Sequence, residues 1–300
     1  MRVLEFPQAQ TEESFRDRLE GELDNIGDLP TLPTIVTALE RALRSDETNA
    51  ADVASIIAED PSMTANVLRV ANSAYYAALA GSISSVAGAV ARLGFSEIRN
   101  LCTTIAVVRT FGKMGRQLNH RMFWKHSIVA AIATRVIGHY CHPAAPFSED
   151  EAWVAGLLHD VGSLVLDQYF PDAFQKVRAA AEEQNRPYAE AEDKILKIDH
   201  GEVGGTLLSR WDLPHPIVTA VSFHHQPTRA EADDRPLVQA VHLADSICTS
   251  LGIGDGGDGI PAAFSNSAWY DLDLSVTNMP DIIEHVTQEA NRCETLLSLI

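Results

Sequence analysis

The spacing of apolar residues along most of the chain is the feature that most restricts its fold. Ile35, Leu39 and Leu43 recur at intervals of about one helical turn, and the run from Met122 to Gly138 is apolar nearly all round. Such spacing is typical of helices, and the chain has no convincing run in which apolar and polar residues alternate as they do in a strand. We therefore predict an all-α protein.

Residues that favour helix ends predict several boundaries. Asp60 followed by Pro61 indicates a helix start, and Gly94 indicates a helix end. Ser96 is predicted to cap the helix that follows Gly94. Farther along the chain we expect helices over 122–138, 149–166, 187–198, 203–211, 214–225, 236–251 and 279–299.

The apolar pattern weakens around residues 112–118, and we place a boundary between two helical lobes there. The predicted organisation is an N-terminal helical lobe over residues 1–115 and a second lobe over residues 116–252. Residues 253–300 would form a loop and a C-terminal helix that packs on the rest. The loop at 252–259 is rich in glycine and aspartate but lacks the full spacing of a calcium loop, so we expect it to be flexible.

Net charge and cysteine usage exclude some classes of function. The chain has 23 Lys plus Arg and 41 Asp plus Glu, which gives a net charge of −18. A surface this negative repels nucleic-acid backbones, so we expect no direct nucleic-acid partner, and solubility alone is a sufficient reason for the acidity. The four cysteines show no C-x-x-C spacing, and neither a signal core nor a membrane-spanning apolar run is evident. We therefore expect a cytoplasmic protein with no membrane partner.

Imidazole and carboxylate side chains recur in order through the second half of the chain. The set consists of His126, His159, Asp160, His200, His224, His225 and Asp245. Such groups together hold divalent ions such as Fe, Mn or Zn, and their number exceeds what one tetrahedral site needs. The set therefore predicts two adjacent ions that share a carboxylate. The alternative is a hydrogen-bonded network of buried histidines without a metal.

Short strings in both halves stand in a fixed order: Leu29-Pro-Thr-Leu-Pro33, Val67-Leu-Arg-Val-Ala-Asn-Ser73, Ala155-Gly-Leu-Leu-His-Asp-Val-Gly162 and His224-His-Gln-Pro227. From about residue 25 to about residue 250, the sequence resembles the HDOD family, a bacterial group related to the HD-domain phosphohydrolases. The resemblance implies a signalling or regulatory module with an HD-like helical bundle in its second lobe. It also implies that all seven residues of the set are metal ligands, with Asp160 bridging two ions.

Two departures separate the chain from HD proteins that cleave cyclic dinucleotides. Ser163 stands where those proteins usually carry a lysine, and the sequence after Gln226 lacks their Gly-Tyr-Pro element. Loss of a cation near a phosphate would remove charge stabilisation from the transition state.

Two functional hypotheses follow from the resemblance. In the first, the chain is a regulatory module whose metal site is structural or sensory and whose N-terminal lobe binds a partner protein. In the second, it is a metal-dependent phosphohydrolase that acts on a nucleotide or another phosphoester, with Asp160 as the candidate catalytic group. The departures at Ser163 and Gln226 favour the first, whereas the complete ligand set favours the second.

Overall fold

The computed structural model describes residues 19, 21, 33–43, 45, 47–73, 82–111, 117–141, 145–256, 260 and 264–297. Within these residues every regular element is helical, which confirms the predicted fold class. The N-terminal half contains α2 (Thr34–Leu43), α3 (Ala50–Ala58), α4 (Pro61–Ala71), α5 (Val86–Leu93) and α6 (Phe95–Phe111). The rest contains α7 (His120–Tyr140), α8 (Glu149–Leu158), α9 (Val161–Tyr169), α10 (Pro171–Gln184), α11 (Tyr188–Leu196), α12 (His200–Arg210), α13 (His215–Phe223), η1 (Pro227–Arg229), α14 (Arg235–Ser250), α15 (Asn266–Asp271), η2 (Val276–Asn278) and α16 (Met279–Leu297).

Two of the predicted helix boundaries are confirmed. The Asp60 carboxylate accepts hydrogen bonds from the backbone N–H groups of Ser62 and Met63, at 2.8 and 2.9 Å, and so caps α4. Gly94 ends α5 with a φ of 86°, a backbone conformation that glycine adopts without a steric penalty.

The prediction that Ser96 caps a helix is wrong. Helix α6 begins one residue earlier, at Phe95, so Ser96 lies inside its first turn. The Ser96 hydroxyl instead donates a hydrogen bond to the Asp150 carboxylate at the start of α8. The partner of this serine is therefore a distant carboxylate, which local sequence does not reveal.

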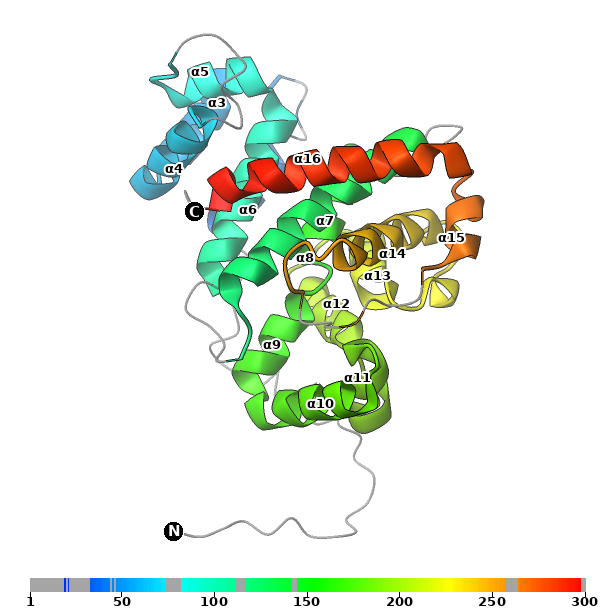
Figure 1. Ribbon diagram of the computed structural model, residues 1–300. Helices are drawn as coiled ribbons and strands as arrows, with labels where there is room; N and C mark the ends of the chain where they lie inside the picture. The colour runs from blue at the N-terminus through cyan, green and yellow to red at the C-terminus, as the bar shows by residue number, and fades with distance from the viewer. Residues whose placement is uncertain are drawn as a thin grey trace, which may run out of the picture.

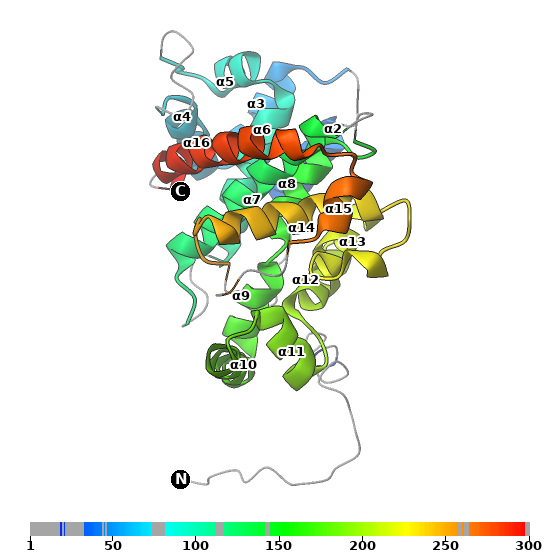
Figure 2. The same ribbon diagram turned by 45° about the vertical axis from the view of Figure 1, so that its right-hand side comes forward.

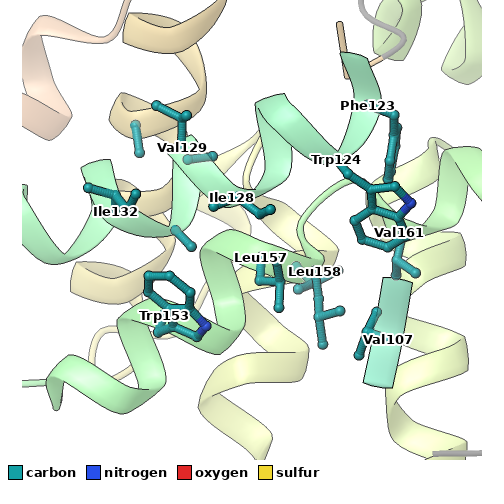
Figure 3. Packing of buried hydrophobic residues seen from close by; sticks show 14 of the residues in the cluster. Val107, Phe123, Trp124, Ile128, Val129, Ile132, Trp153, Leu157, Leu158 and Val161 are labelled. Atoms are coloured by element: carbon teal, nitrogen blue, oxygen red, sulfur yellow. The ribbon is translucent and has the colours of Figure 1, made fainter. Parts of the chain in front are cut away.

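Helix α7 is the central element of the fold. It packs against α8, α14 and α16, and α16 crosses it as the long red helix in Figures 1 and 2. The buried apolar core is continuous from Leu39 in α2 to Val286 in α16. Figure 3 shows part of this core, where Val107 of α6 belongs to the same buried group as Trp124 of α7 and Val161 of α9. Elements of the N-terminal half therefore share one core with the helices that carry the histidines.

The predicted lobe boundary at residue 115 lies outside the described residues, which run to 111 and begin again at 117. The division into lobes stays a prediction. Among the described helices, none is both long and apolar enough to cross a lipid bilayer.

Candidate metal centre

The seven residues of the predicted set lie together in the interior of the helical bundle. Their donor atoms form two adjacent groups, each within 4.8 Å: one of Asp160, His200, His224 and His225, the other of His126, His159 and Asp245. All are buried except His225, which is half-buried. The chain supplies them from α7, the α8–α9 junction, the first residue of α12, the end of α13, and α14. Residues up to 119 positions apart in sequence therefore meet in one site.

Asp160 lies between the two groups. Its Oδ2 atom is 3.1 Å from Nε2 of His159 and 3.5 Å from Nε2 of His126. Its Oδ1 atom is 3.2 Å from Nε2 of His200 and 3.6 Å from Nε2 of His224. Each carboxylate oxygen thus faces one group, which is the arrangement that a carboxylate shared between two ions requires.

Hydrogen bonds on the outer side of four rings determine which nitrogen faces inward. Nδ1 of His126 donates to the Ile253 carbonyl at 3.2 Å, and Nδ1 of His159 donates to the Gly156 carbonyl at 2.8 Å. Nδ1 of His224 likewise donates to a backbone carbonyl at 2.8 Å, and Nδ1 of His200 donates to the Glu192 carboxylate at 2.7 Å. A neutral imidazole that donates from Nδ1 carries a lone pair on Nε2. These four Nε2 lone pairs therefore point toward Asp160.

The resulting contacts suit a bound cation. Nε2 of His126 is 3.2 Å from Nε2 of His159 and 3.2 Å from the Asp245 carboxylate. Neither oxygen of the fully buried Asp160 carboxylate, nor Nε2 of His224, has a hydrogen-bond partner of acceptable geometry. Lone pairs and anionic oxygens at these separations repel one another in a buried site unless positive charge lies among them. The donor set of imidazole nitrogens and carboxylates matches the ligands of Fe, Mn or Zn.

The pKa shifts of Asp160, Asp245 and His225 favour the charge states that bind metal. Burial acts to raise the pKa of Asp160, but the neighbouring His159 imidazole, with His200 and His224, holds it well below its usual range. Burial similarly opposes ionisation of Asp245, yet His126 lowers the pKa of that carboxyl. Burial, followed by repulsion from His224 and His200, lowers the pKa of His225 well below its usual value. Ionised carboxylates and neutral imidazoles are the states that bind metal.

The structure corrects the single helix predicted over residues 149–166. The chain forms α8 and α9 instead, separated by a turn at His159 and Asp160. Adjacent residues on an uninterrupted helix point about 100° apart. At the break between the helices, His159 and Asp160 face the same site. Nε2 of His159 lies 3.1 Å from Oδ2 of Asp160.

Glu192 is a buried member of the site that the sequence did not reveal. Its carboxylate accepts hydrogen bonds from both the backbone N–H and Nδ1 of His200, at 2.8 and 2.7 Å. A carboxylate behind a histidine ligand fixes the ring and increases its basicity. Glu192 lies eight residues before His200 in a different helix, so no local motif joins them. His242 of α14 also contacts the site, because its Nδ1 donates to the His224 carbonyl at 2.7 Å.

The backbone after α14 covers one side of the centre. We call residues 252–256, which form an irregular loop, the cover loop. The Asp255 N–H donates to the Met122 carbonyl at 3.0 Å. A Cβ atom added at Gly256 would lie 2.1 Å from Asp160 Oδ2 and 2.9 Å from the His126 ring. The described part of the predicted flexible loop is thus fixed against α7, while residues 257–259 lie outside the description.

Comparisons with known proteins agree with this architecture. The sequence pattern of the HDOD domain matches residues 29–227. An uncharacterized protein of Treponema pallidum (strain Nichols) is 25% identical over 227 residues, which make up 74% of this chain and 42% of that protein. This chain therefore spans less than half the length of that relative.

Solved structures share the fold. An HDOD domain protein of unknown function from Geobacter sulfurreducens is 26% identical with a TM-score of 0.71, covering 92% of this chain and 98% of its own. A candidate signal transduction protein from Marinobacter aquaeolei VT8 is 22% identical with a TM-score of 0.76, over 98% and 63% of the two chains. A candidate phosphohydrolase from Shewanella amazonensis SB2B is 21% identical with a TM-score of 0.72, over 94% and 97%.

Proposed function

Because this chain belongs to the HDOD family, we propose that it is a bacterial signal-transduction module built around a centre of two divalent metal ions. The solved structure from Marinobacter aquaeolei VT8, described as a candidate signal transduction protein, supports the regulatory part of this proposal through its shared fold. Fold similarity alone does not carry function, so the site must supply the main support.

The observation that carries the proposal is the contact between His126 and His159. Their Nε2 atoms lie 3.2 Å apart, and both rings donate from Nδ1 to backbone carbonyls on the other side. With those donors in place, the facing nitrogens are lone pairs in the neutral rings. In the neutral rings these two lone pairs face each other at 3.2 Å, beside the carboxylate oxygens of Asp160 and Asp245. A shared cation removes the conflict.

The two groups of donor atoms define which residues would hold each ion. His126, His159 and Asp245 would hold one, while His200, His224 and His225 would hold the other, and Asp160 would contact both. Glu192 keeps the His200 ring in place, and the cover loop excludes solvent from the His126 side. When bound, divalent ions would supply native-state stability and Lewis acidity.

In a regulatory module the bound ions would stabilise one conformation, and a partner protein would recognise that conformation. We place the partner on the N-terminal helices, because α6 joins them to the core around the metal centre through α8. Loss of metal would then weaken partner binding through the shared core, since a ligand that binds only the native state stabilises it by mass action.

A metal-dependent phosphohydrolase is the alternative function. The complete set of seven convergent ligands favours it, and the Shewanella amazonensis structure is described as a candidate phosphohydrolase. Against it stands Ser163, which is buried in α9 and offers no cation to a developing phosphate charge. We therefore place the regulatory function first.

Replacing the shared carboxylate separates the two functions. Asp160→Asn removes the negative charge that both groups of donors face, so this variant should melt, even with metal present, at the lower temperature of the metal-free wild type. At a metal concentration about 1,000 times the Kd, the lost stabilisation would be about 4 kcal/mol. The measurement is thermal unfolding with and without metal, beside assays of phosphoester and cyclic-dinucleotide hydrolysis. Robust hydrolysis by the wild type that disappears in Asp160→Asn would establish the enzyme instead.

A further inference from the structure

A cavity of about 540 Å³ lies where the N-terminal helices meet the rest of the bundle. Helices α2 and α6 line it from the N-terminal half of the chain. Helices α8 and α13, with the turn that joins α12 to α13, line it from the other half. None of the seven candidate metal ligands is among its lining residues. The cavity is therefore separate from the candidate metal centre, and both halves of the chain create it together.

The inner wall of this cavity is apolar. Val107, Leu158 and Trp211 are buried residues of its lining, and the first two belong to the core drawn in Figure 3. Val36 and Ile217 are buried on the α2 and α13 sides. The volume lies within the range of about 300–1,000 Å³ that small-molecule sites occupy. Such a wall suits the apolar part of a ligand, because apolar surface gains free energy when it leaves water.

Carboxylates outnumber cations around the cavity. Its lining includes two arginines and four acidic residues: Arg41, Arg99, Glu40, Asp150, Glu151 and Asp212. Arg99 pairs with Asp150 and lies 3.7 Å from a Glu40 oxygen, so this cation is already engaged. The exposed Asp212 carboxylate forms neither an ion pair nor a hydrogen bond with another described residue. In a chain whose net charge is −18, this excess of carboxylates attracts a cation to the opening.

We propose that this cavity binds a small organic cation with an apolar body, of the class of aryl-alkyl amines. The aromatic body would pack against the apolar wall, and the ammonium group would donate hydrogen bonds to Asp212 at the opening. Hydrogen bonds between charged groups are stronger than those between neutral ones. The bound ligand would hold α2 and α6 against α8, whose last residue, Leu158, precedes His159. This inference goes beyond the proposed function and does not depend on bound metal.

The probe is 2-phenylethylamine, with 2-phenylethanol as its uncharged counterpart and 3-phenylpropionate as the corresponding anion. The amine stays protonated at about pH 7.5, because alkylammonium groups titrate near about pH 10. Calorimetric titration into the full-length protein should show saturable binding of the amine, with a Kd below about 1 mM. The alcohol should bind at least about fivefold more weakly, because it lacks the charge, and 3-phenylpropionate should not bind.

Two variants locate the bound amine. Asp212→Asn should weaken its binding at least about fivefold, because the charged partner is lost. Thr37→Trp places a large side chain at an exposed lining position of α2, and it should abolish binding. The matched control is Asp273→Asn, the same substitution at an exposed residue outside the lining. Asp212 and Asp273 have φ values of 57° and 53°, which asparagine tolerates.

The affinity for the amine should stay within about twofold of the wild type in Asp273→Asn and after treatment with a chelator, since neither change touches the cavity. Absence of saturable amine binding, or equal binding of the amine and the alcohol, would overturn the inference. Unchanged affinity in either Asp212→Asn or Thr37→Trp would overturn it too, and so would binding that disappears with the chelator. Metal uptake is measured separately, so this inference and the proposed function can fail independently.

Discussion

Gly256 shows how a single residue limits what can surround the proposed metal centre. Its Cα lies against Asp160 and His126, so even a methyl group would enter the space beside the carboxylate. We predict that Gly256→Ala lowers metal occupancy by about one ion per chain, because either the cover loop or the Asp160 side chain must move. Elemental analysis of the purified variant would measure this.

The control for this change is Gly252→Asn in the same loop. Gly252 has a φ of 65° and no atom within 4 Å of an added Cβ, and asparagine tolerates that backbone conformation. Its metal content should equal that of the wild type. Full occupancy in Gly256→Ala would mean that the loop does not restrict the centre.

His225 predicts how the metal-free protein responds to acid. Burial is the main cause that lowers the pKa of His225 well below its usual value, so the unfolded chain binds a proton there at a pH where the folded form does not. Stability is then present above about pH 6.5 and decreases as the pH falls below it, by at most about 1.4 kcal/mol per pH unit for one group. Thermal unfolding of metal-free protein at pH 7.5 and 5.5 would measure the loss, which should be smaller in His225→Gln. A melting temperature that rises toward pH 5.5 would contradict this assignment.

At the scale of helices, close contact between α9 and α12 holds Asp160 beside His200. A Cβ added at Gly162 would lie 1.9 Å from the His200 carbonyl oxygen and 2.7 Å from the Gly204 nitrogen, both backbone atoms. Gly162→Ala must therefore separate the two helices. We predict a destabilisation of about 1–3 kcal/mol, typical of overpacking, together with weaker metal binding.

Urea unfolding of the metal-free variant would measure the change in stability without the contribution of bound ions. Gly88→Ala is the comparison, because its added methyl group would face only side-chain atoms, the nearest being Ser85 Oγ at 3.1 Å. It should cost clearly less than Gly162→Ala. Equal stability of Gly162→Ala and the wild type would show that α9 and α12 are free to move apart.

The helices show what sequence periodicity can and cannot reveal. The predicted helix over 122–138 corresponds to α7, and the one over 236–251 corresponds to α14, each with bounds that differ by only one or two residues. The helix over 149–166 was wrong because apolar spacing continues through His159 and Asp160, although the backbone turns there. Periodicity reports which residues face a core, and it does not report a short turn between two helices that share that core.

Across the whole molecule, the sequence identified potential ligands more readily than the groups that support them. His126 and Asp245 could be predicted as candidate ligands because the histidines and aspartates of this sequence stand in the order that its resemblance to the HDOD family implies. Glu192 and Gly256 could not, because their importance depends on contacts with His200 and Asp160 that only the folded chain creates. The site is thus a product of long-range packing, and its supporting residues have no spacing rule of their own.

The central claim is that the two groups of donors hold two metal ions with Asp160 between them. Anomalous X-ray scattering from crystals of untagged protein, recorded on both sides of the metal absorption edge, tests this most directly. We predict two peaks, one about 2.0–2.3 Å from donor atoms of His126, His159 and Asp245, and one at similar distances from His200, His224 and His225. Crystals of metal-supplemented protein with no anomalous peak within reach of Asp160 would contradict the claim.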